Sequence, residues 1–513
     1  MDKTKKPVKH KAKSADARTS NIPTLIIMTV TIIVSVIFCL FLRQLNLLTD
    51  RYFAIVCIAL IIVILILFLL VRDFSLRLRP IIGLLFSIAF CAVLIYGSRL
   101  LYVTHNAIGN ITTAATEVTE MNVYVRSDDA ANDLSDTIRY TYGIMGEQNR
   151  DVTDKAIRHL SEDLGTTLSI TEFDSPVTLV NALLNKDVDA ILFNASYLTL
   201  LGELENFHDI NTRVKQLTSL TVETEKPAPI DNSASTESSK EESAFKKDRV
   251  ITIFITGIDT YGGVSITSRS DVNIIATINL DTHQIALVTT PRDYYVEFSN
   301  AYGNYDKLTH AGIYGVDTSI ETLEMLYDID IDYFFRVNFS GFQDIIDAIG
   351  GITVDNDVSF STTSWIAEQY YFPAGEIYLD GQSALVYVRE RSAFGDGDMA
   401  RGRHQMLVIQ AVIDKCTSTQ VLSNYTSLLE AIEGNFETNI PYDLISEIVK
   451  EQLESGASWN VVSYSVSGYN DWRTCWSLGT GASVVTPYYE TVDAAKELMR
   501  QVRDGEVPVA PED

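Results

Sequence analysis

Four arginines gather in one short stretch of a chain that is otherwise strongly acidic. Residues 387–405, "YVRERSAFGDGDMARGRHQ", belong to a sequence of 513 residues with a formal net charge of -27. Exposed salt bridges would explain such a cluster, but each contributes only about 0 to 1 kcal/mol. The alternative is a docking place for a strongly anionic group, which guanidinium groups bind through paired hydrogen bonds. The arginines are Arg389, Arg391, Arg401 and Arg403, interspersed with Glu390, Asp396 and Asp398.

Three apolar segments earlier in the chain also carry charged residues at their ends. The segments are "RVITIFITGIDTYG", "SRSDVNIIATINL" and "QIALVTTPRDYYV", and each reads as a strand. Ligands usually bind at strand ends in open α/β sheets. We therefore expect the charged residues to meet at one edge of a sheet. They are Asp259, Arg269, Asp271, Arg292 and Asp293.

The two aspartates Asp259 and Asp271 suggest a site for a hard cation. Magnesium takes one or two protein carboxylates and completes its shell with water and phosphate oxygens. Neighbouring arginines would bind the other phosphate oxygens. In the alternative interpretation Asp259 caps a turn, and Asp271 pairs with Arg269 or Arg292.

The order of these motifs resembles the LytR-CpsA-Psr family. The resemblance covers about residues 250–415 and rests on several colinear motifs: "TGIDTYG", "SRSDVNIIATIN", "TTPRDYYV", "KLTHAGIYG", "NFSGFQDIIDAIGGITV", "LDGQSALVYVRERS" and "GDGDMARGRHQ". Three apolar runs and an additional domain make the chain similar to the CpsA-type branch of capsule gene clusters, often labelled an integral membrane regulatory protein.

This resemblance implies an extracellular phosphotransferase. Its substrate would be a polyprenyl phosphate or pyrophosphate lipid, with the tail in an apolar tunnel and the head group held by arginines and Mg²⁺, or alternatively Mn²⁺. The attached glycopolymer would move to a hydroxyl of peptidoglycan. Carried onto this chain, the metal ligands are Asp259 and Asp271, and the head-group residues are Arg269, Arg292, Arg389, Arg391 and Arg401. Lys307 joins the head-group candidates because it lies near the site by sequence order. The catalytic candidates are Arg292, Asp293 and Asp398, either aspartate serving as general base or holding an arginine in place.

One position departs from the family pattern. Many members carry arginine two positions after the first motif aspartate, where this chain has Tyr261. The corresponding phosphate contact is therefore missing or comes from elsewhere. Arg403 either joins the head-group site or caps a helix, and His310 is expected to be structural.

One helical face offers walls for an apolar tunnel. The segment "FSGFQDIIDAIGG" repeats large apolar residues at the i, i+3, i+4 spacing of a helix. Ordinary core packing explains this face without any ligand, so the lipid expectation rests on the family resemblance. The residues are Phe339, Phe342, Ile345, Ile346 and Ile349.

Three apolar runs near the N-terminus predict membrane helices. Residues 22–42, 53–71 and 81–97 are each close to the roughly 20 apolar residues that a bilayer requires. Lysine and arginine favour the cytoplasmic side. The basic residues 1–20 and the loop with Arg72, Arg77 and Arg79 should therefore be inside, with everything after about Leu101 outside. An extracellular location permits a disulfide between Cys416 and Cys475, which the sequence leaves open.

Composition and element order predict the domain organisation. Residues 226–247 are rich in Ser, Pro, Glu and Lys and have almost no large apolar residues, which favours a flexible tether. The fold class expected is α/β: an α/β/α sandwich with a mixed central sheet, preceded by three transmembrane helices and a small α/β accessory domain. The predicted segments are a cytoplasmic tail (1–22), membrane helices (23–103), an extracellular accessory domain (104–223), a linker (224–247), the catalytic domain (248–506) and a tail (507–513).

Three functions compete. The first is attachment of capsular polysaccharide, or a similar glycopolymer, from undecaprenyl pyrophosphate to peptidoglycan. The second is a non-catalytic regulator of capsule assembly that binds polyprenyl lipids, with capsule assembly proteins as candidate partners, or a lipid pyrophosphatase. The third, a DNA-binding regulator, is disfavoured because the acidic external region repels phosphate backbones.

Overall fold

The computed structural model describes residues 22–44, 50–72, 79–112, 116–225, 249–258, 263–363, 369–395, 398–417 and 434–511. The chain divides into two units. One comprises Met1–Gly109 and Tyr442–Gly456, and the other comprises Asn110–Pro441 and Ala457–Asp513. Most of the predicted linker lies outside the described residues.

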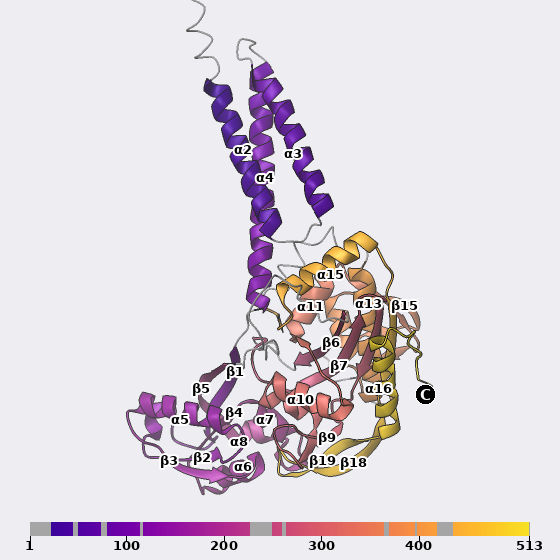
Figure 1. Ribbon diagram of the computed structural model, residues 1–513. Coiled ribbons are helices and arrows are strands. Elements are labelled where there is room, and N and C mark those ends of the chain that lie inside the picture. The colour runs from indigo at the N-terminus through magenta and orange to yellow at the C-terminus, as the bar shows by residue number, and fades with distance from the viewer. Residues whose placement is uncertain are drawn as a thin grey trace, which may run out of the picture. The chain divides into compact units, whose positions relative to one another are not determined.

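The first unit contains the three predicted membrane helices: α2 (Ile22–Gln44), α3 (Asp50–Val71) and α4 (Arg79–Thr112) (Figure 1). Each includes a segment of 21 to 25 residues with a mean hydropathy of 2.3 to 3.8, enough to cross a bilayer. Helices α2 and α4 approach closely at Gly97, where an added Cβ would lie 2.9 Å from the ring of Phe38. The helices support membrane anchoring, while their orientation stays a prediction. The same unit includes α15 (Tyr442–Ser455).

The accessory domain is a five-stranded sheet with helices on both faces. Its strands are β1 (Thr116–Arg126), β2 (Thr141–Met145), β3 (Ser169–Phe173), β4 (Ala190–Asn194) and β5 (Val214–Glu225), in the order β3-β2-β4-β1-β5. Strands β2, β3 and β4 are parallel, whereas β1 runs antiparallel to β4 and β5. Gly165 caps the C-terminus of helix α5 with a φ of +63°, a conformation that suits glycine. The helices are α5 (Arg150–Leu164), α6 (Pro176–Asn185), α7 (Ser196–Gly202) and α8 (Ile210–Arg213), with 3-10 turns η1 (Leu134–Thr137) and η2 (Glu205–Phe207).

The second domain is built on a six-stranded mixed sheet. Its order is β16-β11-β6-β7-β8-β17. The pairs β6–β11 and β8–β17 are parallel, and β6–β7, β7–β8 and β11–β16 are antiparallel. The strands are β6 (Val250–Ile258), β7 (Ser270–Asn279), β8 (Gln284–Thr289), β11 (Tyr333–Val337), β16 (Phe436–Thr438) and β17 (Asn460–Ser465).

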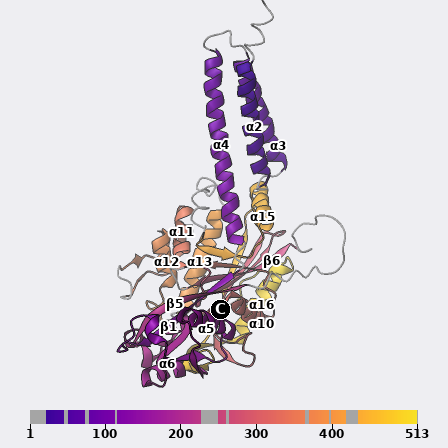
Figure 2. The ribbon, with the colours of Figure 1, turned by 90° about the vertical axis from the view of Figure 1, so that its left-hand side faces the viewer.

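Helices cover both faces of this sheet, so its strands are apolar on both sides. Ile275 on β7 packs into the core beneath α10 and α16, and its neighbour Ile274 faces the opposite core with Met406 of α13. Figure 2 shows α11, α12 and α13 on one side and α10 and α16 on the other. The α/β/α sandwich is confirmed. Its helices are α9 (Leu308–Ala311), α10 (Val316–Tyr327), α11 (Phe339–Ala348), α12 (Gly381–Arg389), α13 (Asp398–Cys416) and α16 (Tyr489–Arg503), with the 3-10 turn η3 (Gly312–Tyr314).

Short antiparallel strand pairs complete the domain. They are β9 (Tyr295–Glu297) with β10 (Tyr305–Lys307), β12 (Ile352–Asn356) with β15 (Gly375–Leu379), β13 (Phe360–Ser361) with β14 (Tyr371–Phe372), and β18 (Gly468–Cys475) with β19 (Thr480–Pro487). Residues of η3 and of the β18–β19 hairpin, including Ile313 and Val484, share one buried core with Leu179 and Phe193 of the accessory domain. The two α/β domains therefore pack on each other directly.

Candidate functional site

A cavity of about 740 Å³ lies between the sheet and helices α11, α12 and α13. This volume falls within the roughly 300–1,000 Å³ of small-molecule sites. Alternate residues of β6, β7 and β8 face it, as the two-residue period of a strand requires. Apolar side chains make up most of the walls. The sheet contributes Ile253, Ile255, Ala276, Ile278, Ile285, Leu287 and Phe335, and α12 and α13 contribute Leu385, Val388, Val408, Ile409, Val412 and Ile413.

Helix α11 supplies most of the wall that its periodicity suggested. Asn338 caps the helix by accepting a hydrogen bond from the Gly341 amide at 2.7 Å. Ile349 is 1% exposed and belongs to the core beside the cavity, so ordinary packing accounts for it. Four of the five predicted residues line the cavity: Phe339, Phe342, Ile345 and Ile346.

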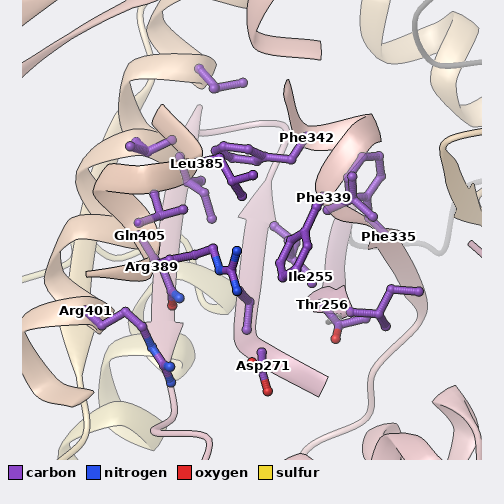
Figure 3. A pocket seen from close by; sticks show the side chains of 18 of the residues that line it. Ile255, Thr256, Asp271, Phe335, Phe339, Phe342, Leu385, Arg389, Arg401 and Gln405 are labelled. Carbon is purple, nitrogen blue, oxygen red and sulfur yellow. The ribbon is translucent and has the colours of Figure 1, made fainter. Parts of the chain in front are cut away.

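One end of the cavity is strongly charged. Figure 3 shows Asp271 and Arg401 at this end, Phe342 and Leu385 at the other, and the Arg389 guanidinium between them. Residues from four separate segments of the chain thus meet here, which agrees with the expectation from the strand ends. The lining includes Arg269, Asp271, Arg292, Arg389, Arg391 and Arg401.

Asp271 and Arg292 are directly paired. Nη1 of Arg292 lies 3.1 Å from Oδ1 and 3.0 Å from Oδ2 of Asp271. The hydroxyl of Thr309 donates to the same Oδ1 at 3.1 Å. The pairing of Asp271 with Arg292, one of the alternatives from the sequence, therefore exists in the structure. This pairing leaves room for further partners of the Asp271 carboxylate, because a carboxylate offers about four lone-pair positions.

The pKa of Asp271 reflects this surplus of positive charge. Burial alone would raise the pKa of this carboxyl group, but the charges of Arg292, Arg269 and Arg401 outweigh it and lower the pKa to about 2. Asp271 is therefore ionised at neutral pH. Five guanidinium groups line the cavity together with two carboxylates among the described lining residues, Asp271 and Glu203, so an incoming anion meets a positive field.

Asp293 and Lys307 lie behind Arg292 and are not part of the cavity lining. Nζ of Lys307 lies 3.3 Å from Oδ1 of Asp293, whose Oδ2 lies 3.8 Å from Nε of Arg292. Burial raises the pKa of Asp293, but Lys307, Arg292 and Arg401 lower it below its ordinary value. An ionised carboxylate between two cations suits holding Arg292 in place better than accepting a proton. The predicted head-group contact of Lys307 is thus indirect here.

The three charged residues of the "RER" motif, residues 389–391, have different surroundings. Helix α12 ends at Arg389, whose guanidinium carbon lies 4.1 Å from the centroid of the Phe339 ring. Glu390 is fully buried and accepts hydrogen bonds from the backbone amides of Thr363 and Ala393 at 3.1 and 2.9 Å. Glu390 therefore holds the loop, while Arg389 and the exposed Arg391 face the cavity.

Residues 214–491, more than half of the chain, match the LytR_cpsA_psr family. The chain belongs to the LytR-CpsA-Psr family. Two curated relatives are named polyisoprenyl-teichoic acid–peptidoglycan teichoic acid transferase TagU. The protein from Bacillus cereus is 36% identical over 211 residues, which cover 41% of this chain and 67% of the relative. That from Bacillus mycoides is 32% identical over 258 residues, 50% of this chain and 79% of the relative.

A solved structure is also similar. The crystal structure of B. subtilis TagV is 25% identical, covering 51% of this chain and 100% of its own, with a TM-score of 0.42. The assignment to the LytR-CpsA-Psr family rests on the sequence match and confirms the resemblance seen in the motifs. Both curated relatives are named as transferases.

Three positions of the LytR-CpsA-Psr pattern cannot be placed. Asp259 and Tyr261 lie outside the described residues, as does the side chain of Asp398, the first residue of α13. The roles predicted for the two aspartates stay predictions. Arg403 is exposed and does not line the cavity, whereas Arg401 is 7% exposed and does.

Several lining residues were not expected from the LytR-CpsA-Psr motifs. Glu203, which follows α7 of the accessory domain, reaches the cavity and accepts a hydrogen bond from Nη1 of Arg269. No local pattern marks this glutamate, because its partner is distant in the sequence. Gln405 also lines the cavity, and its position four residues after Arg401 on α13 was a usable helical signal.

His310 and the two cysteines of the predicted external region have structural surroundings. Nδ1 of His310 lies 2.7 Å from Oδ1 of Asp306 and 2.9 Å from Oγ of Ser477, all buried. This agrees with a structural role. Cys416 is exposed and Cys475 is buried, and no disulfide joins them.

Asp271 fits a magnesium ion as one ligand. It is ionised, lines the charged end, and its side chain is 19% exposed. Among the described residues no three His, Cys, Asp or Glu side chains cluster as a metal site. Magnesium does not require such a cluster, since it commonly uses one or two carboxylates with water and phosphate oxygens.

Proposed function

We propose that this protein is a membrane-anchored phosphotransferase that attaches a glycopolymer, such as capsular polysaccharide, from a polyprenyl pyrophosphate carrier to peptidoglycan. The observation that carries the proposal is the cavity itself, whose walls are apolar and whose one end combines five arginines with Asp271. A polyprenyl pyrophosphate has the same two parts, an apolar chain and a charged end.

The two parts of the cavity suit the two parts of this substrate. Burying the polyprenyl chain against isoleucine, valine and phenylalanine contributes about 25 cal/mol for each Å² of apolar surface removed from water. The arginines bind phosphate oxygens through charge-assisted hydrogen bonds. Arg401 and Arg292 are 7% and 8% exposed, so their charges are little screened by water and act strongly on a bound phosphate.

In the proposed reaction a peptidoglycan hydroxyl attacks the phosphorus atom that carries the glycan. A bond forms between that oxygen and phosphorus, the bond from phosphorus to the bridging oxygen breaks, and polyprenyl phosphate leaves. The hydroxyl proton passes to a base, for which Asp398 remains the candidate. Arg292, Arg389 and Arg401 are positioned to stabilise charge on the phosphate oxygens, the main contribution to catalysis in phosphoryl transfer.

We further propose that Asp271, together with Asp259, holds Mg²⁺, or alternatively Mn²⁺. Bound there, the ion would neutralise part of the pyrophosphate charge. The pairing with Arg292 keeps Asp271 ionised and oriented toward the cavity, as a ligand must be. The names of the curated relatives support peptidoglycan as the acceptor, and the basic N-terminal residues support an extracellular placement of the domain.

The test uses the full chain in nanodiscs with Mg²⁺, a glycan-bearing polyprenyl pyrophosphate and peptidoglycan. Release of polyprenyl phosphate and transfer of labelled glycan are followed together. We expect Arg389→Ala and Asp271→Ala to reduce transfer at least about 100-fold. Arg503→Ala removes an exposed arginine of α16 outside the cavity lining and should leave transfer unchanged.

The other outcomes separate the alternatives. Unchanged transfer in Arg389→Ala and Asp271→Ala would refute the assigned site. Tight lipid binding without turnover would indicate a non-catalytic regulator. Phosphate release that does not depend on peptidoglycan would indicate a lipid pyrophosphatase.

A further inference from the structure

The accessory domain is joined to the LytR-CpsA-Psr domain by polar contacts as well as by a shared core. Val118 of β1 donates to the Ser265 carbonyl at 2.9 Å and accepts from the Thr267 amide at 2.8 Å. Arg336, 2% exposed, lies 3.1 Å from Oε1 of Glu117. Such contacts hold the two domains in one arrangement, so a cleft between them is a defined feature.

A second, polar cleft of about 150 Å³ lies between these domains. At roughly 30 Å³ for each liquid water molecule, it holds about five, room comparable with one sugar ring. Its lining is dominated by hydroxyl, amide, carboxylate and guanidinium groups, in contrast to the apolar cavity. The accessory domain contributes Glu120, Asn194, Ala195, Ser196 and Thr199, and the other domain contributes Ile266, Thr267, Ser268 and Arg269.

Asn194 has an unmet hydrogen-bonding group in this lining. The residue is 3% exposed, and its Oδ1 accepts the backbone amide of Ser196 at 2.8 Å. Because a backbone amide only donates, this bond fixes which end of the side chain is the nitrogen. Nδ2 has no hydrogen-bond partner among the described residues. Buried polar groups are nearly always paired, so an unpaired donor here points to a ligand with acceptor oxygens.

Arg269 connects the cleft with the cavity, since it lines both. Its guanidinium donates to Glu203, so a carboxylate of the accessory domain orients the residue that separates the two spaces. A ligand in the cleft therefore lies next to the arginines assigned to the pyrophosphate. A group bound beside a pyrophosphate head group is either the glycan attached to it or the glycan that attacks it.

We propose that the cleft between the accessory domain and the LytR-CpsA-Psr domain is a saccharide subsite of the transferase. This inference rests on the proposed function. Glu120 accepts hydrogen bonds from sugar hydroxyls and Asn194 donates to them, while Thr199 and Ser268 can do either. Ser196 can accept one, because its own hydroxyl donates to the Thr267 carbonyl at 3.1 Å. The accessory domain thereby takes part in recognising one glycan substrate and is more than a structural module.

The experiment measures binding to the full chain in nanodiscs with three probes. They are polyprenyl pyrophosphate, the same lipid carrying a disaccharide, and a soluble peptidoglycan disaccharide. Thr199→Trp fills the cleft from an exposed position of α7, and Glu120→Gln removes its carboxylate without changing its size. Thr212→Trp introduces the same side chain at an exposed position of α8 outside the cleft lining and is the matched control.

We expect Thr199→Trp and Glu120→Gln to leave the affinity for the bare lipid unchanged. Both should lower the affinity for one sugar-bearing probe. For Thr199→Trp we expect a loss of about tenfold or more, equivalent to about 1.4 kcal/mol. Loss for the glycan-bearing lipid assigns the subsite to the donor, and loss for the soluble disaccharide assigns it to the acceptor.

Two results would overturn the subsite. One is unchanged affinity of both sugar probes in both cleft variants, and the other is an equal loss in Thr212→Trp. If the wild type bound no polyprenyl lipid and transferred nothing, the proposed function would fail. Disaccharide binding that Thr199→Trp abolishes would still support the subsite in that case, so the two failures are distinguishable.

Discussion

The guanidinium carbon of Arg389 lies 4.1 Å from the centroid of the Phe339 ring. The first residue belongs to the end of α12 and the second to the start of α11. Their stacking places a positive charge where the apolar walls meet the charged end of the cavity. The arrangement holds the Arg389 guanidinium at the depth where a lipid chain would join its phosphate.

Phe339→Leu should weaken binding of polyprenyl phosphate about two- to thirtyfold, because a cation–π contact contributes roughly 0.5 to 2 kcal/mol to orienting Arg389. Phe342→Leu removes an aromatic ring from the same wall and is the control for lost apolar contact. Equal effects of the two substitutions on the dissociation constant would show that the stack has no role of its own.

Asp271→Asn should lower kcat for transfer at least about 100-fold and raise the Mg²⁺ concentration needed for half-maximal rate. The substitution keeps the shape of the side chain but removes the charge that orients Arg292 and would bind the ion. Asp281→Asn, which removes an exposed aspartate outside the cavity lining, should behave as the wild type. A normal Mg²⁺ titration curve for Asp271→Asn would contradict the metal assignment.

Asp271 should also make stability depend on acid pH. Its pKa falls from an ordinary 3.8 to about 2 in the folded chain, so folding favours the ionised form. The stabilisation is complete above pH about 4 and is lost as pH falls toward about 2. The free energy of unfolding of the wild type should therefore exceed that of Asp271→Asn by on the order of 2 kcal/mol at neutral pH. Thermal unfolding in detergent across this range should show the gap between their Tm values closing.

Lys307→Met should raise KM for the lipid substrate several-fold while preserving the fold. Nζ of Lys307 contacts Asp293, which in turn lies beside Arg292. The residue therefore positions a head-group arginine without lining the cavity itself. A conservative Lys307→Arg should restore most of the affinity. An unchanged KM in Lys307→Met, with a lowered Tm, would reduce Lys307 to a structural role.

Val412→Trp should shorten the lipid tail that the protein accepts. Val412 lines the cavity 11 residues beyond Arg401 on α13, about 16 Å along a helix. An indole there blocks the deep part of the apolar space and leaves the charged end unchanged. Affinity for long polyprenyl phosphates should fall, while a short geranyl pyrophosphate should bind as before. Asp414→Trp, at an exposed position of the same helix, controls for the added ring, and equal losses for both tail lengths would argue against a tail tunnel.

The membrane helices, the strands with charged ends and the family membership follow from the sequence by itself. Each depends on neighbouring residues, such as an apolar run of bilayer length or the two-residue period of β7. The ordered motifs, for their part, identify the family without any coordinates. Even the choice between Arg401 and Arg403 has a local basis. Residues two positions apart on a helix point in directions that differ by about 200°, so Arg401 and Arg403 cannot both face the same cavity.

The tertiary structure alone decided which charged groups meet and which lie behind others. Asp293 follows Arg292 directly, yet it lies outside the cavity lining and contacts Lys307, because adjacent side chains leave the backbone in different directions. Glu203 meets Arg269 from another domain. No spacing in a linear chain encodes that contact, since it depends on how two separately folded sheets pack. The cavity is likewise a property of packing, because it exists only where α11, α12 and α13 cover the sheet without filling it.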